Sequence, residues 1–141
     1  MRVLVDTNVL LDVFAKREPF YAASARLWAL AERGQVEAYI SAISFNNAFY
    51  IVRKLATAAE AKEMLRWLRD EFHVVPLSEQ ILHQAIDSGV IDFEDAIQFF
   101  SAIHCAADAI VTRNVDDYPG QKIPTMTPEE FLALHGPGAA Q

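Results

Sequence analysis

The sequence predicts an α/β fold of three layers, in which a central parallel sheet of about five strands lies between helices. Short apolar runs rich in β-branched residues recur along the 141-residue chain. The segments between these runs have the periodicity and the end signals of helices. Strands that alternate with helices form βα units, and such units build a parallel sheet covered on both faces.

The first run, RVLVD, is continuously apolar and ends at an acid, which is typical of a strand buried on both faces. With it, five strands are predicted, over residues 2–6, 36–41, 73–77, 109–112 and 123–126. Seven helices are predicted, over residues 8–16, 20–33, 44–56, 59–72, 79–88, 94–107 and 128–134. We expect Gly34 and Gly89 to end the second and the fifth helix.

Length and composition fit one domain, which we expect to span residues 1–135 and to be followed by a flexible tail over 136–141. Asp6 and Asp12 interrupt the apolar N-terminal stretch before a signal-peptide core could form, and no apolar run has membrane-spanning length. The single cysteine, Cys105, lies in a run typical of a buried helix face, which favours a structural thiol in a reducing compartment. A cytoplasmic location without a membrane partner is therefore expected.

The formal net charge is −7, with 19 acidic against 12 basic residues. This balance argues against broad nucleic-acid binding through a basic surface, since such binding depends on phosphate neutralisation. It is compatible with a nuclease whose carboxylates collect around divalent cations, because that kind of site is acidic when empty. Part of the charge also serves solubility.

Functional groups in an open α/β sheet collect beyond the carboxyl ends of the strands. The first strand delivers Asp6, Thr7 and Asn8 to this edge. One of the three could simply cap the following helix. An acid with buried neighbours loses solvation, however, and a bound cation compensates for that loss. We predict that Asp6 is a metal ligand and that Thr7 or Asn8 caps the helix.

A second group of acids, Asp92, Glu94 and Asp95, opens the helix over 94–107. Asp92 is expected at the N-cap, with Asp95 three positions later as the weaker half of a capping box. Capping explains at most two of the three acids, and clustered like charges repel one another. Asp95 is therefore the candidate for a second metal-binding acid.

The segment that follows the fourth strand contains Arg113, Asn114 and Asp117. Alone, it would be interpreted as a solvated turn, in which Asn and Asp bond their own backbone. Because this strand is expected beside the strand that carries Asp6, Asn114 and Asp117 become candidates for further ligands or for groups that position water.

The helix over 44–56 offers Ser44 as an N-cap, with Asn47 at the third helical position. Arg53 lies on the same helix. A solvated surface role and a contact with substrate phosphate are equally compatible with its position.

Several common catalytic motifs are absent from the sequence: a glycine-rich phosphate loop, a nucleophile elbow, a paired-cysteine metal motif and a histidine cluster. Carboxylates without sulfur or imidazole ligands suit Mg²⁺ or Mn²⁺ rather than zinc. The sequence therefore points to phosphoryl chemistry.

Three segments, VLVDTNVLLD, ISAISFNNAFYIVRK and DFEDAIQFFSAIHCAADAIVTRNVDDY, together make the chain similar to the PIN-domain family, and within it to the VapC-type toxins of toxin–antitoxin pairs. The resemblance implies an endoribonuclease that uses Mg²⁺ or Mn²⁺. Carried over by position, it implies that Asp6, Asp95 and Asp117 are the acids of the site and that Asn114 is a further ligand. Where the family usually has a Glu in the central helix, this chain has Asn47, which can coordinate only as a neutral oxygen donor.

The resemblance also implies a cognate antitoxin protein that covers the acidic cleft, and a homodimer. The substrate contacts expected with it are Thr7, Asn8, Arg53 and Arg113. The apolar face of the helix over 59–72 could serve a dimer or antitoxin surface, or could pack in the core. The alternatives in other classes are a PIN-like module that binds RNA or protein without catalysis, and an aspartyl phosphatase. The phosphatase would require a second Asp at position 8, which is Asn.

Overall fold

A computed structural model describes residues 1–120 and 122–137 of the chain. The strands are β1 (Arg2–Val5), β2 (Glu37–Ser41), β3 (His73–Val75), β4 (Ala109–Val111) and β5 (Thr125–Met126). The α-helices are α1 (Thr7–Phe14), α2 (Tyr21–Glu32), α3 (Ile43–Leu55), α4 (Ala58–Glu71), α5 (Glu79–Asp87), α6 (Phe93–His104) and α7 (Pro128–His135). A short 3₁₀ helix, η1 (Val115–Asp117), follows β4.

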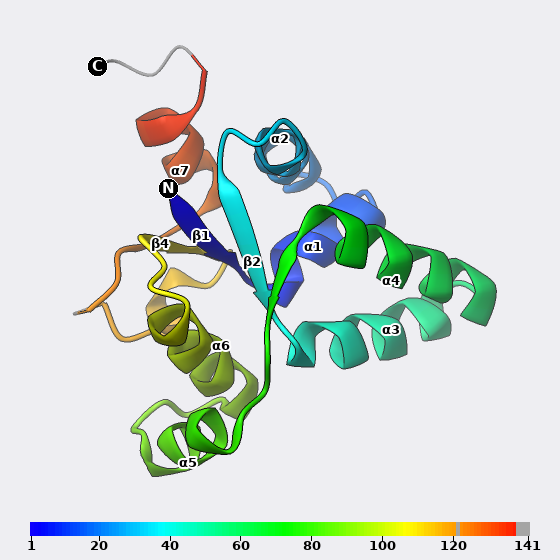
Figure 1. Ribbon diagram of the computed structural model, residues 1–141. Helices are drawn as coiled ribbons and strands as arrows, with labels where there is room; N and C mark the ends of the chain where they lie inside the picture. The colour runs from blue at the N-terminus through cyan, green and yellow to red at the C-terminus, as the bar shows by residue number, and fades with distance from the viewer. Residues whose placement is uncertain (121, 138–141) are drawn as a thin grey trace.

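The five strands form one parallel sheet in the order β3-β2-β1-β4-β5. β1 is the central strand and pairs with β2 on one side and with β4 on the other (Figure 1). Since β1 and β4 are far apart in sequence, the chain reverses its direction of winding between them. Crevices for ligands form beyond the carboxyl ends of strands at such a reversal. The predicted three-layer α/β/α fold with five strands is confirmed.

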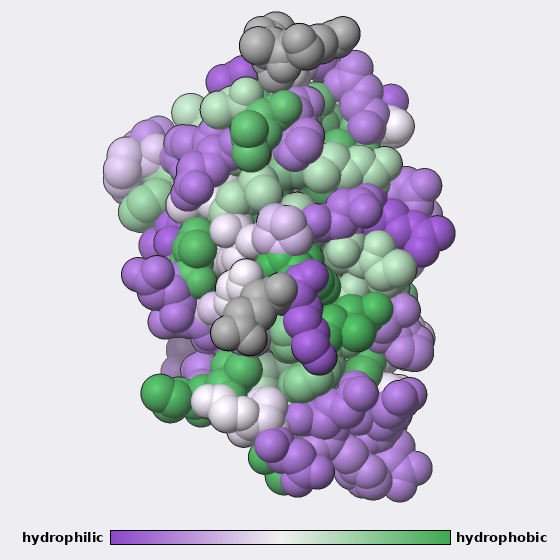
Figure 2. All heavy atoms as spheres, turned by 90° about the vertical axis from the view of Figure 1, so that its left-hand side faces the viewer, coloured by the Kyte–Doolittle hydropathy of each residue, from purple (hydrophilic) through white to green (hydrophobic). Residues whose placement is uncertain are grey.

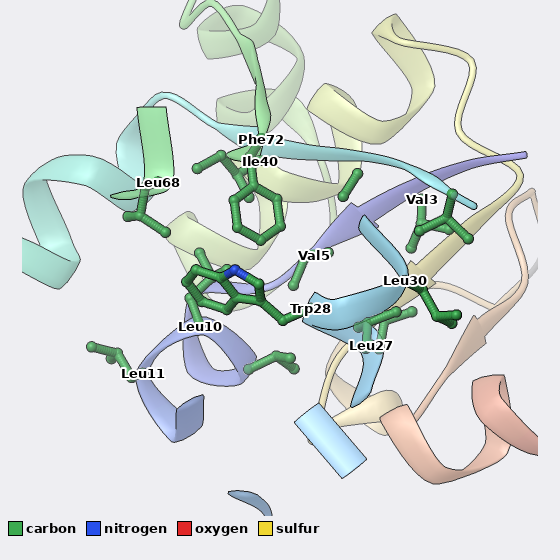
Figure 3. Packing of buried hydrophobic residues seen from close by; sticks show 14 of the residues in the cluster. Val3, Val5, Leu10, Leu11, Leu27, Trp28, Leu30, Ile40, Leu68 and Phe72 are labelled. Carbon is green, nitrogen blue, oxygen red and sulfur yellow. The ribbon is translucent and has the colours of Figure 1, made fainter. Parts of the chain in front are cut away.

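The side chains of the central strands alternate between two cores, one on each face of the sheet. Val3 and Val5 point into a core made with α1, α2, α3, α4 and α7, and Leu4 points into a core made with α5 and α6. The two layers of helices lie on opposite sides of the sheet (Figure 1). On the larger side, the Trp28 indole packs against the Phe72 ring, with 4.9 Å between ring centroids (Figure 3). Burial on both faces explains why β1 and β4 are continuously apolar.

The predicted helices are all present, with small differences at their ends. Gly34 follows α2 with a φ of 70°, a left-handed conformation that glycine adopts without strain. The expected role of Gly89 is wrong, because α5 ends at Asp87 and Ser88 already has extended backbone. α6 ends at His104 instead of continuing to Ala107, since Ala106 takes a φ of 56°. Cys105 is therefore the C-cap of α6, half-buried, and burial raises the pKa of its thiol.

The apolar face of α4 packs in the core. Of the two roles expected for this face, core packing and a dimer or antitoxin surface, the structure supports core packing. Ala61, Met64 and Leu68 on this face are buried. Of the expected tail, Gly136 and Pro137 follow α7, and residues 138–141 lie outside the described part of the chain. Among the described residues, none of the helices has the length and the apolar character that a membrane crossing requires.

Replacing Leu68 by Ala tests this core. Leu68 has no exposed surface and belongs to the cluster around Trp28 (Figure 3). We expect Leu68→Ala to lower the free energy of unfolding by about 2–5 kcal/mol, because truncation loses apolar burial and leaves a cavity. Leu55→Ala is the matched control, since Leu55 is 68% exposed. Chemical denaturation measures both, and equal small losses in the two variants would contradict the assigned packing.

Candidate functional site

The carboxylate of Asp6 lies at the carboxyl end of β1 and is only 4% exposed. Its Oδ1 atom accepts hydrogen bonds from the Asn8 backbone N–H at 3.3 Å and from the Gln98 side-chain amide at 3.2 Å. Its Oδ2 atom accepts from the Thr112 hydroxyl at 2.7 Å and from the Tyr118 hydroxyl at 2.9 Å. Four hydrogen-bond donors therefore satisfy this buried carboxylate, and none of them belongs to a basic residue.

Asp6 also caps α1, which corrects the expectation that Thr7 or Asn8 would do so. α1 begins at Thr7, one residue earlier than expected, and Asp6 is its N-cap, with the side chain bonded to the Asn8 N–H. β1 correspondingly ends at Val5. Capping and a role in the site are compatible, because the cap uses a single hydrogen bond to Oδ1.

Thr7, the first residue of α1, connects this helix to α6 and to α3. Its backbone N–H donates to Oε1 of Gln98 at 3.2 Å. Its hydroxyl donates to Oε2 of Glu94 at 2.8 Å and lies 2.7 Å from the Ser44 hydroxyl. Because the single proton of Thr7 goes to Glu94, Ser44 is the donor to Thr7. Thr7 is buried and fully bonded, so its expected contact with substrate stays a prediction.

The N-terminal turns of α3 reach this network through Ser44. The expectation that Ser44 caps the helix is wrong, since α3 begins at Ile43 and its N-cap is Ala42, which makes no side-chain hydrogen bond. Asn47 follows Ser44 by three residues and therefore shares its side of the helix. Arg53 lies in the exposed last turn, about 14 Å further along the helix axis from Ser44. The structure does not bring Arg53 to the edge where Asp6 lies.

The second group of acids is at the start of α6. Asp92 is the N-cap, as expected, and its carboxylate accepts from the Asp95 N–H at 2.9 Å. Burial raises the pKa of Asp95 to about 7, and the nearby charges of Asp6, Asp92, Asp117 and Glu94 add to the rise. The structure thus brings Asp6, Asp95 and Asp117 within electrostatic reach of one another.

The segment after β4 closes the site on its other side. Asn114 precedes η1, is exposed, and donates its backbone N–H to the Thr112 hydroxyl at 3.1 Å. Asp117 ends η1 and, together with Asp95 and Tyr118, lines an open pocket of about 690 Å³ between this segment and the start of α6. Figure 2 shows the face of the molecule that lies to the left in Figure 1, where apolar surface in several places lies between hydrophilic side chains.

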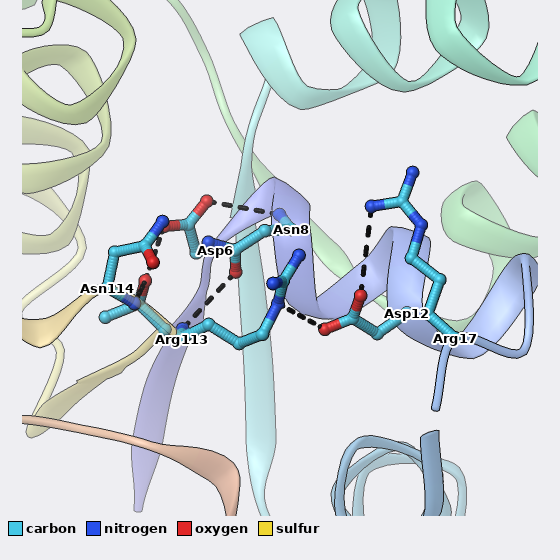
Figure 4. A network of polar contacts seen from close by, with 7 residues as sticks. Asp6, Asn8, Asp12, Arg17, Arg113 and Asn114 are labelled. Atoms are coloured by element: carbon cyan, nitrogen blue, oxygen red, sulfur yellow. Dashed lines mark hydrogen bonds and ion pairs between the residues drawn. The ribbon is translucent and has the colours of Figure 1, made fainter. Parts of the chain in front are cut away.

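Arg113 makes an ion pair with Asp12, a residue that the sequence did not single out. Nε of Arg113 lies 2.6 Å from Oδ2 of Asp12, and Arg17 approaches the other carboxylate oxygen at 3.9 Å (Figure 4). The guanidinium also stacks over the Phe20 ring, 4.3 Å from its centroid. Asp12 has no exposed surface, and burial raises its pKa although the two arginines act in the opposite direction. A contact between Arg113 and substrate stays a prediction, beside this structural role.

Asn8 connects the ion pair to the site. Its side-chain Oδ1 accepts from the Arg113 backbone N–H at 3.4 Å, and its own N–H donates to Asp6 (Figure 4). The first turn of α1 is thereby held to the segment after β4. This side chain is half-buried, and its expected contact with substrate also stays a prediction.

The chemistry of these donors fits a hard divalent cation. Carboxylate and amide oxygens are what Mg²⁺ and Mn²⁺ prefer. The pKa of Asp95 is raised first by burial and then by the neighbouring acids, and a cation would offset both effects. Within residues 1–120 and 122–137, however, no three or more His, Cys, Asp or Glu side chains converge closely enough to hold a metal ion as they stand.

The fold and the site together define a class of protein. It is a parallel α/β domain with acids at the carboxyl edge of its central strands. Residues 2–116 match the family model of the PIN domain. The chain therefore belongs to the PIN-domain family, and the resemblance seen in the sequence is confirmed at that level. A search of curated proteins found no match.

Solved structures support the same fold. The chain is similar to VapBC2 from Rickettsia felis bound to a DNA fragment from its promoter, with a TM-score of 0.65 and 18% identity over 89% of this chain and 97% of that one. The chain is also similar to a toxin–antitoxin complex from Klebsiella pneumoniae, with a TM-score of 0.65 and 23% identity over 89% of this chain and 97% of that one. A third similar structure is VapC20 from Mycobacterium tuberculosis, a toxin that cleaves the sarcin–ricin loop. Its TM-score is 0.64, with 16% identity over 77% of this chain and 86% of that one. At these identities the likeness shows the fold.

Sequence reasoning missed the neutral donors around Asp6. Gln98 is completely buried on α6, three residues after Asp95, and this helical spacing places the two on one side. A polar residue in that position within an otherwise apolar stretch was the available signal. Tyr118 gave no signal, because an aromatic residue after a polar turn is ordinary core material.

The charge of Asp95 makes stability depend on pH. Its pKa in the folded state, about 7, exceeds the ordinary value of 3.8, so the folded state binds the proton more tightly and stability falls as pH rises from about 4 to 7. We expect Asp95→Asn to remove this loss and to raise the free energy of unfolding at pH 8 by about 1 kcal/mol, after allowance for solvent screening. Denaturation at pH 4 and pH 8 measures this effect, and an equal difference at both pH values would contradict the raised pKa of Asp95.

The Asp12–Arg113 ion pair gives a second prediction. Asp12→Asn should lower the free energy of unfolding by about 1–3 kcal/mol, because it leaves the Arg113 guanidinium, whose side chain is 25% exposed, without its charged partner. Asp70→Asn is the control, since it removes an exposed ion pair with Arg69 and should cost at most about 1 kcal/mol. Thermal and chemical unfolding of both variants decide whether the buried pair is structural.

Proposed function

We propose that the chain is a metal-dependent endoribonuclease that hydrolyses RNA phosphodiester bonds, and that it is the toxin of a toxin–antitoxin pair. The observation that carries the proposal is that Asp95 lies within electrostatic reach of Asp6 and Asp117 at the carboxyl edge of β1 and β4, in a chain of the PIN-domain family. Two of the similar structures are toxin–antitoxin assemblies, and a third is a toxin that cleaves the sarcin–ricin loop.

Asp6, Asp95 and Asp117 would hold Mg²⁺ or Mn²⁺, with Asn114 and Asn47 as neutral oxygen donors. The cation, when bound, would activate water and offset the charge of the scissile phosphate and its leaving oxygen. The protein supplies orientation: Gln98 and Thr112 hold the Asp6 carboxylate from two sides. Asp95 must lose its proton to become a ligand, so its raised pKa favours binding above pH 7.

The proposed partners follow from the same comparison. RNA is the substrate, and Thr7, Asn8, Arg53 and Arg113 are proposed to contact it. Arg53 would do so at a distance from the acids, along a longer stretch of RNA, in line with its place in the last turn of α3. A cognate antitoxin would cover the acidic pocket, and the toxin would act as a homodimer in the cytoplasm, where its RNA lies.

A module that binds RNA or protein without catalysis is the second candidate. It is favoured by Asn47, which carries no charge, and by the absence of a preassembled group of three metal-ligating side chains in the described residues. Calorimetric titration with Mn²⁺ separates the two functions, because a non-catalytic module has no need of a tightly bound cation.

The test of catalysis is Asp6→Asn. This isosteric change removes one charge from the site while keeping an oxygen for the Asn8 cap, so we expect the fold to persist and Mn²⁺-dependent cleavage of labelled RNA to fall about a hundredfold or more. Asp70→Asn, on the exposed surface of α4, should cleave like the wild type. Full activity of Asp6→Asn, with thermal unfolding unchanged, would overturn the assignment of Asp6.

A further inference from the structure

The Asp6 carboxylate has no free position for a cation. An ionised carboxylate offers about four lone-pair sites, and Asp6 receives four donors, two on each oxygen. Direct coordination of a cation by Asp6 therefore requires that one donor leaves. The four donors differ in how readily they can do so.

Three of the donors are held by further bonds. The Asn8 N–H is part of the first turn of α1. Gln98 has no exposed surface, and its Oε1 accepts from the Thr7 backbone. Thr112 is also completely buried, its N–H donates to the Met126 carbonyl at 3.0 Å, and its hydroxyl accepts from Asn114. Moving any of them would break the sheet edge or a helix start.

Tyr118 is different, because it follows the short η1 segment and lies outside the regular elements. Its backbone N–H makes a long 3.3 Å bond to the Val115 carbonyl. Tyr118 also lines the open pocket of about 690 Å³ that contains Asp95 and Asp117. Tyr118 is only 6% exposed, and its hydroxyl can leave Asp6 only if the whole side chain turns, for which the adjoining pocket offers room.

We propose that the Tyr118 hydroxyl is a displaceable cap on Asp6, which satisfies the buried carboxylate in the metal-free protein and leaves it when a divalent cation binds. This inference rests on the proposed function, since it concerns the same cation. It makes Tyr118 a residue that sets metal affinity: its bond to Asp6 stabilises the empty site and competes with the cation.

A displaceable cap and a purely orienting residue predict opposite effects of removing the Tyr118 hydroxyl on the affinity for the cation. If Tyr118 only held Asp6 in place for the cation, its removal would weaken metal binding. If it is a displaceable cap, its removal strengthens metal binding, because the variant has no hydrogen bond to break. One hydrogen bond of this kind corresponds to about a three- to tenfold change in affinity.

The experiment is calorimetric titration of Mn²⁺ into the full-length wild-type chain, Tyr118→Phe and Tyr39→Phe at pH 8. Tyr39→Phe is matched, since Tyr39 also donates to a carboxylate, Glu37, at an exposed position. We expect Tyr118→Phe to lower the Kd for Mn²⁺ about three- to tenfold, and Tyr39→Phe to leave it unchanged. In parallel, Mn²⁺ should change the tyrosine absorbance of the wild type, and Tyr118→Phe should lack this change.

The outcomes separate the two proposals. Wild-type binding of Mn²⁺ with an equal or higher Kd in Tyr118→Phe would overturn the displaceable cap and leave the nuclease proposal standing. Failure of the wild type to bind Mn²⁺ at all would overturn both. Thermal unfolding of Tyr118→Phe verifies that the variant folds. If it does not fold, the tyrosine absorbance of the wild type decides. Binding of Mn²⁺ without a change in this absorbance would reject the displaceable cap.

Discussion

The burial of the Asp6 carboxylate at the end of the central strand is the constraint on which the rest of the site depends. A buried charge that lacks partners would cost several kcal/mol, so the fold must supply donors. They come from the first turn of α1, from α6, from the end of β4 and from the segment after η1. Satisfying one side chain therefore holds together the start of α1, α6 and the segment from Thr112 to Tyr118.

A second buried acid, Asp12, is satisfied in a different way. Arg113 and Arg17 neutralise it, and stacking on Phe20 fixes the Arg113 guanidinium (Figure 4). Asp6 instead receives only neutral donors, so its negative charge is retained and acts on Asp95. Both acids belong to α1, Asp6 as its N-cap and Asp12 within the helix, yet only the charge of Asp6 acts on Asp95, while the charge of Asp12 is paired with arginine. This division leaves the pocket edge acidic.

The fold followed from the sequence because its signals are local. Continuous apolar runs at β1 and β4 predict strands buried on both faces, and the structure confirms them with the alternation of Val3, Leu4 and Val5 between two cores. Helix ends were less predictable. Ala106, two residues after the end of α6, adopts a left-handed conformation, and an alanine gives no signal for it, because this conformation is unfavourable for residues with a Cβ atom.

The sequence by itself determined the fold class, the family and the acids that a strand end and a helix start deliver to one edge, because these depend on periodicity, turn chemistry and motif spacing. Only the tertiary structure decided that Asp6 caps α1, that Gln98 and Tyr118 bond its carboxylate, and that Arg113 is paired with Asp12. The physical reason is distance along the chain. Apart from the cap, which joins Asp6 to Asn8, these bonds join residues about a hundred positions apart, and which donors meet a buried charge is set by how the layers pack.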